Sequence, residues 1–279
     1  MNHPAELSIH SYLVNATKGE SSMSEDTIQQ VGAEVMEAMR KQFGGGNRRD
    51  KFRLRMSNIG RPTCQLWFEK NKPETALPKP TTFVMNMLLG DIVEAAFKGI
   101  LKEAGVSYRD AEHVTLELDK TKVNGTYDLI IDGAVDDVKS ASDWSYRNKF
   151  ESFDTLKGSD PFGYVGQLAG YAKASGSKAG GWWVVNKANG NIKYVPADTI
   201  DMEEEITTLN KTVDTVESNE FKRCFSPVPE TFRGKATGNT ILNDSCKFCD
   251  YRFSCFESLK ETESRVSQAK NKPTVAYID

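Results

Sequence analysis

The stretch that most constrains the fold is residues 124–140, which read NGTYDLIIDGAVDDVKS. Two short β-type runs, 126–131 and 134–139, flank the pair Asp132-Gly133. Asp-Gly between two such runs predicts a tight hairpin, because both central positions of the turn need positive φ. We therefore expect an antiparallel strand pair at this place in the chain.

The predicted hairpin gathers charged side chains. Residues two apart on a strand share a face, so Asp137 and Lys139 point the same way while Val138 points into the core. The hairpin places Asp128 beside Asp137. Two carboxylates next to an ammonium can hold a divalent metal and a water, so the stretch predicts a metal-dependent phosphodiesterase centre. An exposed hairpin with ordinary acids is the competing interpretation.

The composition is that of an ordinary globular protein. The chain has 279 residues, of which 38% are hydrophobic and 27% charged, which is enough material for one large domain. No apolar run approaches the roughly 18 residues of a membrane span, and the N-terminus lacks a signal-peptide layout. We expect a cytoplasmic protein with no membrane partner. The net charge of −3 argues neither for nor against nucleic acid.

Hydrophobic periodicity predicts an α/β fold in which a central mixed β-sheet is flanked by helices. We divide the chain into an N-terminal arm, 1–23, a single domain, 24–260, and a polar C-terminal tail, 261–279. Besides a short segment after Cys64, the predicted helices are 24–43, 81–104, 143–153, 163–173 and 199–223. Besides the hairpin, the predicted strands are 106–108, 113–118, 182–185 and 192–195.

Two predicted helices carry polar residues that could reach the hairpin. Glu94 sits within the apolar stripe of helix 81–104, where a carboxylate is costly to bury unless it pairs or binds a metal. The alternative is that Glu94 lies at the edge of the stripe and reaches solvent. Gln167 and Tyr171 are four apart and share one face of helix 163–173.

A basic run precedes Cys64 and holds a single acid, Asp50. Such a run is usually a solvated face, but its position before the candidate site favours contact with phosphates. The predicted DNA-binding residues are Arg48, Arg49, Lys51, Arg53, Arg55 and Arg61. Trp182 and Trp183 should occupy the two faces of one strand, where an exposed one could stack a base.

Four short motifs follow one another along the chain: Gly90-x3-Glu94, Gly125-x2-Asp128, Asp137-x-Lys139 and Gln167-x3-Tyr171. In this order they resemble the PD-(D/E)XK nuclease superfamily, in its RecB-like branch, over roughly residues 55 to 260. Asp137 stands where many members of the superfamily carry a glutamate. A second Asp/Glu-x-Lys triplet, Glu220-Phe221-Lys222, falls in a charged stretch and is read as a coincidence.

The resemblance implies a restriction-endonuclease-like core and a catalytic role for Asp128, Asp137, Lys139, Gln167 and Tyr171. It implies that Glu94, Asp128, Asp137 and the Val138 carbonyl bind Mg²⁺ or Mn²⁺. Lys139 would orient or deprotonate the attacking water, and Gln167 and Tyr171 would position the phosphate or the scissile strand.

Five cysteines in a cytosolic protein favour metal ligation over disulfides. Cys64 and the late series Cys246-x2-Cys249-x5-Cys255 resemble the iron–sulfur version of this branch, found in AddB nuclease domains and in CRISPR-associated nucleases that assist spacer acquisition. The resemblance implies a 4Fe–4S cluster that closes the domain through its C-terminal region, with Zn²⁺ on four thiolates as the rival. Cys224 remains as a buried or free thiol that could exchange with one of the four.

The expected function is that of a Mg²⁺- or Mn²⁺-dependent deoxyribonuclease, an exonuclease acting on single-stranded DNA or DNA ends in recombination, repair or phage DNA processing. The stretch SDPFGYVGQLAGYA is similar to stand-alone nucleases of phages and mobile elements. The alternatives are a CRISPR spacer-acquisition nuclease and a non-catalytic DNA-binding scaffold, with RNA ranked below DNA as the substrate. A second copy of the chain and a recombination or replication protein are the other partner classes.

Overall fold

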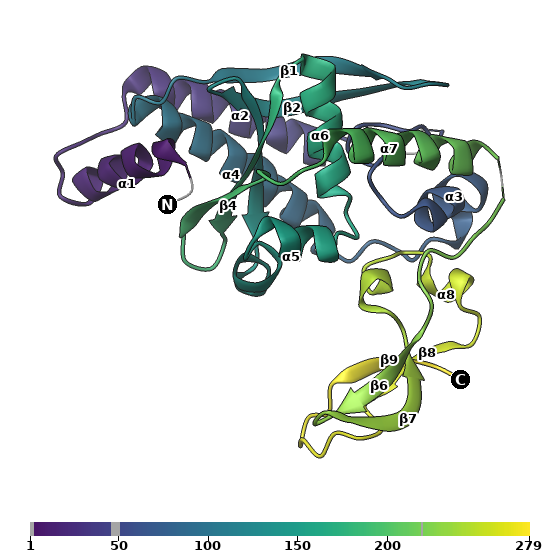
Figure 1. The fold of residues 1–279 in the computed structure, drawn as a ribbon. Helices are drawn as coiled ribbons and strands as arrows, with labels where there is room; N and C mark the ends of the chain where they lie inside the picture. Colours follow the sequence, from purple (N-terminus) through teal and green to yellow (C-terminus); the bar gives the residue numbers. More distant parts are fainter. Residues whose placement is uncertain (1–2, 46–50, 219) are drawn as a thin grey trace.

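The predicted hairpin forms the middle of a five-stranded sheet (Figure 1). The structure is a computed structural model, which describes residues 3–45, 51–218 and 220–279. Asp132 and Gly133 have φ of 50° and 78°, as the turn prediction requires. The strands lie in sequence order and are β1 (Arg109–Glu117), β2 (Lys122–Ile131), β3 (Ala134–Ala141), β4 (Lys178–Asn186) and β5 (Ile192–Pro196). Because β3 and β4 are parallel and the other neighbours antiparallel, the sheet is mixed, as predicted.

The parallel pair needs a crossover, and that segment carries helices that cover part of one face. The predicted helix 143–153 is confirmed only in its first part: residues 143–149 are helical, with a π-helical turn at Ser145–Lys149, and a separate helix α5 (Phe153–Gly158) follows. Ser152 breaks the segment in two, because its side chain accepts a hydrogen bond from the Thr155 amide and starts α5 as an N-cap. Next comes α6 (Tyr164–Ser175), which begins after Gly163 at φ 74°.

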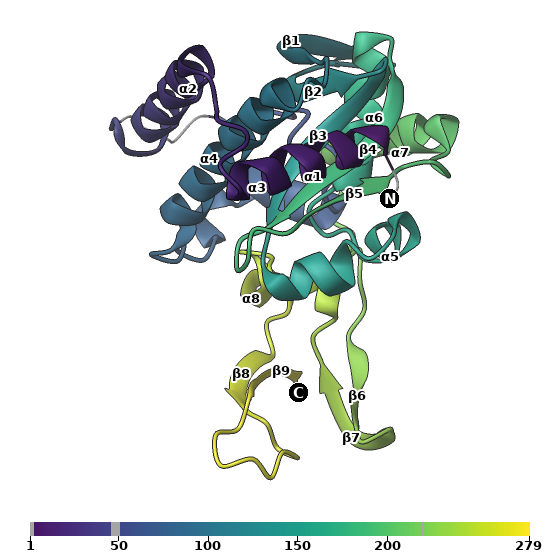
Figure 2. The ribbon, with the colours of Figure 1, turned by 90° about the vertical axis from the view of Figure 1, so that its left-hand side faces the viewer.

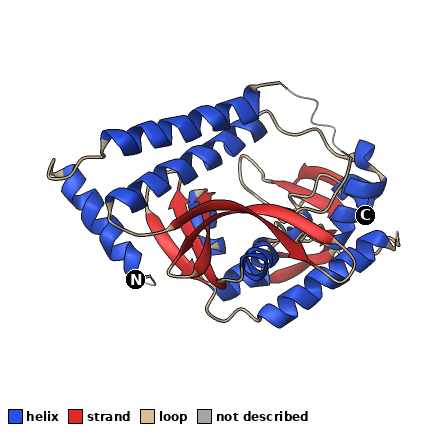
Figure 3. Cartoon of the chain, turned by 90° about the horizontal axis from the view of Figure 1, so that it is seen from above, coloured by secondary structure: helices blue, strands red, loops and turns tan. Residues whose placement is uncertain are grey.

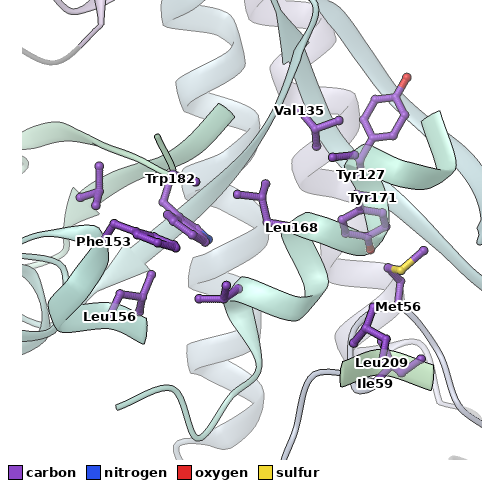
Figure 4. Close-up of a cluster of buried hydrophobic side chains, with 14 of the residues drawn as sticks. Met56, Ile59, Tyr127, Val135, Phe153, Leu156, Leu168, Tyr171, Trp182 and Leu209 are labelled. Carbon is purple, nitrogen blue, oxygen red and sulfur yellow. The ribbon is translucent and has the colours of Figure 1, made fainter. Parts of the chain in front are cut away.

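Helices cover both faces of the sheet, and an apolar layer lies between the sheet and the helices on each face (Figure 3). Figure 4 shows the layer beneath α6 and α7 (Met202–Glu217), where Trp182 packs near Leu168 and Phe153. Trp183 belongs to the opposite layer, against α4 (Phe83–Glu103). Both tryptophans are fully buried, so neither can stack a base. The predicted α/β class, with a central mixed sheet flanked by helices, is confirmed.

The described part of the predicted N-terminal arm, residues 3–23, is ordered mainly as a helix that packs on the sheet. Helix α1 (Pro4–Thr17) starts at a capping box made by His3 and Glu6. It buries Ile9 in the layer of Trp183, and Glu6 also accepts a hydrogen bond from the Tyr194 amide of β5. The next helix, α2 (Glu25–Phe43), lies along α4 and has Ser24 as its N-cap.

The C-terminal residues also form a structure that the sequence did not predict. A second sheet of order β6-β7-β9-β8 extends below the main body (Figure 2). Residues 261–279 are therefore no tail: Lys260 pairs with Tyr277, and the buried Tyr277 donates a hydrogen bond to Glu230 at 3.0 Å. The strands are β6 (Val228–Phe232), β7 (Lys235–Ile241), β8 (Leu259–Glu263) and β9 (Thr274–Ile278).

Short helices lie where the second sheet meets the main body (Figure 1). They are α3 (Thr63–Asn71), η1 (Pro73–Thr75), η3 (Asp244–Cys246) and α8 (Arg252–Cys255). Phe68 of α3 stacks on Tyr251 just before α8, with ring centroids 5.3 Å apart. Within the described ranges, the helices are all too short or too polar to cross a lipid bilayer.

The packing of Tyr277 predicts that the C-terminal residues stabilise the protein. We expect Tyr277→Ala to lower the free energy of unfolding by about 3 to 5 kcal/mol, because it removes a buried ring and leaves the Glu230 carboxylate without one donor. Lys272→Ala, at an exposed position of the same region, should change it by less than about 0.5 kcal/mol. Urea unfolding followed by circular dichroism measures both. Equal stability of the two variants would restore the view of a loose tail.

Candidate functional site

The hairpin brings Asp128, Asp137 and Lys139 to one place. The last registered pair of β2 and β3 on this side is Leu129↔Asp136, so Asp128 and Asp137 lie next to it. Asp128 Oδ2 accepts a hydrogen bond from the Val138 amide at 2.8 Å, and Lys139 Nζ lies 2.5 Å from Asp137 Oδ2. Val138 itself is buried in the layer beneath α4. The geometry expected from strand alternation is therefore present.

The two carboxylates and the ammonium are electrostatically coupled. Burial, together with the charge of Asp137, raises the pKa of Asp128 to about 6. Burial also raises the pKa of Asp137, although Lys139 opposes this effect. For Lys139 burial lowers the pKa, but the Asp137 and Asp128 carboxylates outweigh it and hold the pKa above its ordinary value. Lys139 is thus an ammonium at neutral pH.

Glu94 of α4 joins this group. Its side chain is 29% exposed and pairs with Lys98, one turn later, at 2.9 Å. Burial and the nearby charge of Asp128 raise the pKa of Glu94. Lys98, which also lies 3.0 Å from Asp110, was not predicted, although the i,i+4 spacing of a glutamate and a lysine is a recognisable signal.

Helix α6 contributes Gln167 and Tyr171 on the opposite side of the hairpin. Tyr171 is buried, and burial raises its pKa to about 12. Its side chain hydrogen-bonds Gln167 and interacts electrostatically with Asp128, Asp137 and Lys139. Gly125 allows this approach: a Cβ there would lie 2.8 Å from Tyr171 Cε1 and 2.3 Å from Met56 Cβ. Figure 4 shows Tyr171 directly above Met56. The Gly-x-x-Asp motif thus needs glycine at position 125, because any side chain there would clash with Met56 and Tyr171.

Asp136 is a residue that sequence reasoning missed. It is fully buried and accepts hydrogen bonds from the Gly181 amide, Trp183 Nε1 and the Tyr194 hydroxyl at 2.9, 3.1 and 2.8 Å. Burial raises its pKa to about 7, while the three donors oppose this. Asp136 points away from Asp137 and is not part of the acidic group. It supports the site indirectly, because its hydrogen bonds tie β3 to β4 and β5.

The donor set at the hairpin suits a hard divalent cation. Carboxylate oxygens are the ligands that Mg²⁺ and Mn²⁺ prefer. Among the described residues, buried Asp137 Oδ2 has Lys139 Nζ as its only polar partner, so a cation bound there would share this oxygen with the ammonium or displace it. Within the same residues, no three His, Cys, Asp or Glu side chains are already gathered closely enough to hold an ion. Metal binding therefore requires the acidic side chains to converge further.

The four predicted cysteines line one apolar pocket at the junction with the C-terminal region. Cys64 lies in the first turn of α3, and the other three are Cys246, Cys249 and Cys255. Phe68 and Phe256 also line the pocket. Among the described residues these sulfurs, like the carboxylates of the hairpin, are not gathered closely enough to hold an ion. Burial raises the pKa of Cys246 to about 12 and that of Cys249 to about 11.

Cys224 lies beside this set and is exposed, not buried. Its sulfur accepts a hydrogen bond from the Cys64 amide at 3.1 Å and lies 3.3 Å from the Thr63 hydroxyl. The contact with Cys64 lowers the pKa of Cys224 to about 6 and raises that of Cys64. The structure thus places a fifth thiol next to the pocket, which sequence spacing alone could not show.

The described part of the basic run passes beside β2. Arg48 and Arg49 lie outside the described residues. Lys51, Arg53 and Arg55 line an open groove with a volume of about 1180 Å³. The Met56 amide fixes the segment by donating a hydrogen bond to Asn124 at 2.9 Å. Arg61 instead pairs with Glu69 at 3.4 Å.

Comparison with known proteins assigns this chain to no family. No protein-family model matches the chain, and no curated protein matches it. Among solved structures, the chain is similar to one titled "Crystal structure of SSO0001", with 12% identity and a TM-score of 0.42, over 84% of this chain and 98% of that one. A likeness this low supports no conclusion about fold or function.

The raised pKa values predict that cation binding releases protons. Below pH 6 Asp128 is mostly protonated, so a cation must displace that proton, and Mn²⁺ affinity should fall by about tenfold per pH unit as the pH drops from 6. Calorimetric titration with Mn²⁺ between pH 5 and 8 measures this. Asp128→Asn should bind Mn²⁺ more weakly and with a flatter pH profile. Equal wild-type affinity across that range would contradict the assignment.

Proposed function

We propose that this protein is a metal-dependent DNA nuclease of the PD-(D/E)XK type, an exonuclease acting on single strands or DNA ends. The observation that carries the proposal is the Asp128, Asp137 and Lys139 group, with Lys139 Nζ 2.5 Å from Asp137 Oδ2 and the Glu94 carboxylate coupled to it. A carboxylate cluster with one ammonium is suited to phosphodiester hydrolysis, in which a water oxygen bonds to phosphorus and the bond to the leaving oxygen breaks.

Each residue has a distinct part in this reaction. A divalent cation held by Asp128, Asp137, Glu94 and the Val138 carbonyl would neutralise charge on the phosphate and lower the pKa of the water. The raised pKa of Lys139 favours an orienting role over that of a base, because an ammonium donates hydrogen bonds and cannot take a proton. Tyr171 keeps its proton and, with Gln167, positions the phosphate as a neutral donor.

The cysteine pocket supports assignment of a 4Fe–4S cluster held by Cys64, Cys246, Cys249 and Cys255. Four thiols line a single apolar pocket. Burial raises the pKa of Cys246, Cys249 and Cys255, and the hydrogen bond with Cys224 raises that of Cys64, which favours the protonated thiols in the absence of a metal. Such a cluster would join the start of α3 to the C-terminal segment and close the domain at that side. Zn²⁺ is the alternative occupant of four thiolates.

The catalytic assignment is tested by Lys139→Ala with Lys222→Ala as the matched control. Lys222 belongs to the second Asp/Glu-x-Lys triplet, where it is exposed and 3.9 Å from Glu220. We expect Lys139→Ala to slow cleavage of end-labelled DNA by about 10² to 10⁴-fold, because the water loses its orienting group. Lys222→Ala should cleave at the wild-type rate.

The assay uses single- and double-stranded DNA with free and blocked ends, with Mn²⁺ present, after thermal melting has shown that both variants fold. Wild-type rates in Lys139→Ala would show that the site is assigned wrongly. DNA binding without cleavage by the wild-type protein would favour the scaffold instead.

The cluster assignment is tested by anaerobic purification followed by iron, sulfide and zinc analysis. We expect brown protein with about four irons and four sulfides per chain. Cys249→Ser should lose the colour, whereas Cys224→Ser should keep it, because Cys224 does not line the pocket. Colourless wild-type protein with one zinc per chain would replace the cluster with a zinc site.

A further inference from the structure

A row of aromatic rings leads from Lys139 to the surface of the cysteine segment. The Tyr164 ring lies 5.1 Å from Lys139 Nζ, and Phe162 stacks on Tyr164 with centroids 5.6 Å apart and an interplanar angle of 21°. Phe248, between Cys246 and Cys249, continues the row 5.8 Å from Phe162. The row therefore runs from the candidate nuclease centre to the segment that carries Cys246 and Cys249.

The outer rings do not serve the apolar core. Phe162 is 37% exposed and Phe248 is 70% exposed. Neither belongs to the buried clusters formed by the described parts of the chain. An exposed phenylalanine loses the free energy of apolar burial, so the packing of this chain gives no reason for a ring at residue 248.

A buried ammonium accompanies the row. Lys149 Nζ lies 4.5 Å from the centroids of both Phe162 and Tyr164, and its side chain is only 11% exposed. The nearest carboxylate oxygen, on Asp160, is 3.8 Å away, and in the described part of the chain Lys149 Nζ has no hydrogen-bond acceptor. A buried ammonium without an acceptor is costly, and a phosphate oxygen would satisfy it.

We propose that Phe162 and Phe248 stack the bases of a single-stranded nucleic acid, while Lys149 binds a phosphate next to the one that reaches Lys139. This inference rests on the proposed nuclease function and names its substrate class. Stacking on aromatic rings is available only to unpaired bases, because the bases of a duplex already stack on one another. The row thus selects single strands over duplexes at the entrance to the site.

The test is the affinity for a fluorescent single-stranded oligonucleotide, measured by anisotropy in EDTA so that cleavage does not enter. We expect Phe248→Ala and Phe162→Ala to bind the single strand about tenfold more weakly than wild type and to leave the affinity for a blocked duplex unchanged. Phe221→Ala is the matched control. Phe221 is also 37% exposed in an aromatic group, but it packs on Trp67 and Phe68.

An oligonucleotide with abasic sites separates stacking from phosphate contact. The wild-type protein should bind it about as weakly as Phe248→Ala binds the normal strand, and Phe248→Ala should lose nothing further. Lys149→Met should reduce the slope of log affinity against log salt by about 1 unit. Thermal melting shows whether each variant is folded.

Unchanged single-strand affinity in both phenylalanine variants would overturn the proposal, and so would an equal loss on duplex or abasic DNA, which would indicate a structural role. If the expected affinities are found but the wild-type protein does not cleave DNA, the stacking row stands and only the nuclease function fails.

Discussion

The buried Asp136 carboxylate is the constraint on which the sheet and the site both depend. Its two oxygens accept from groups on β4 and β5, so one side chain fixes three strands. Side chains alternate along a strand, and fixing Asp136 toward Trp183 therefore turns Asp137 and Lys139 toward α6. The Cβ of any residue other than glycine at position 180 would lie 2.1 Å from Asp136 Oδ1, which shows how closely β4 approaches this carboxylate.

The site itself holds more negative than positive charge. Glu94, Asp128 and Asp137 repel one another in a largely buried place, and burial raises the pKa of each. Lys139 and Lys98 compensate part of that charge. A protein that needed only stability would replace such a group with apolar residues, since buried ionic groups are rarely worth their desolvation cost. This imbalance is the reason for proposing that the group binds a cation.

Local signals made the centre of the fold predictable. The Asp132-Gly133 turn, the alternation of β3 and the i,i+4 face of α6 depend on neighbours in sequence, and the structure contains all three. The missed features depend on partners far along the chain. Helix α1 is held by the contact of Glu6 with Tyr194, and the C-terminal sheet by that of Tyr277 with Glu230. No local pattern encodes such pairings, nor the approach of Cys224 to Cys64 or of Phe162 to Phe248.

The cysteine pocket takes its lining from both ends of the main body, with Cys64 early and Cys246 to Cys255 late. During synthesis, the first thiol leaves the ribosome long before the last three, and the sheet can form in between. The pocket is therefore completed only after all strands of the central sheet have been synthesised. Delivery of any inorganic group to the pocket would follow formation of the sheet, and a product truncated before Cys246 would retain the sheet and its acidic centre without three of the four lining thiols.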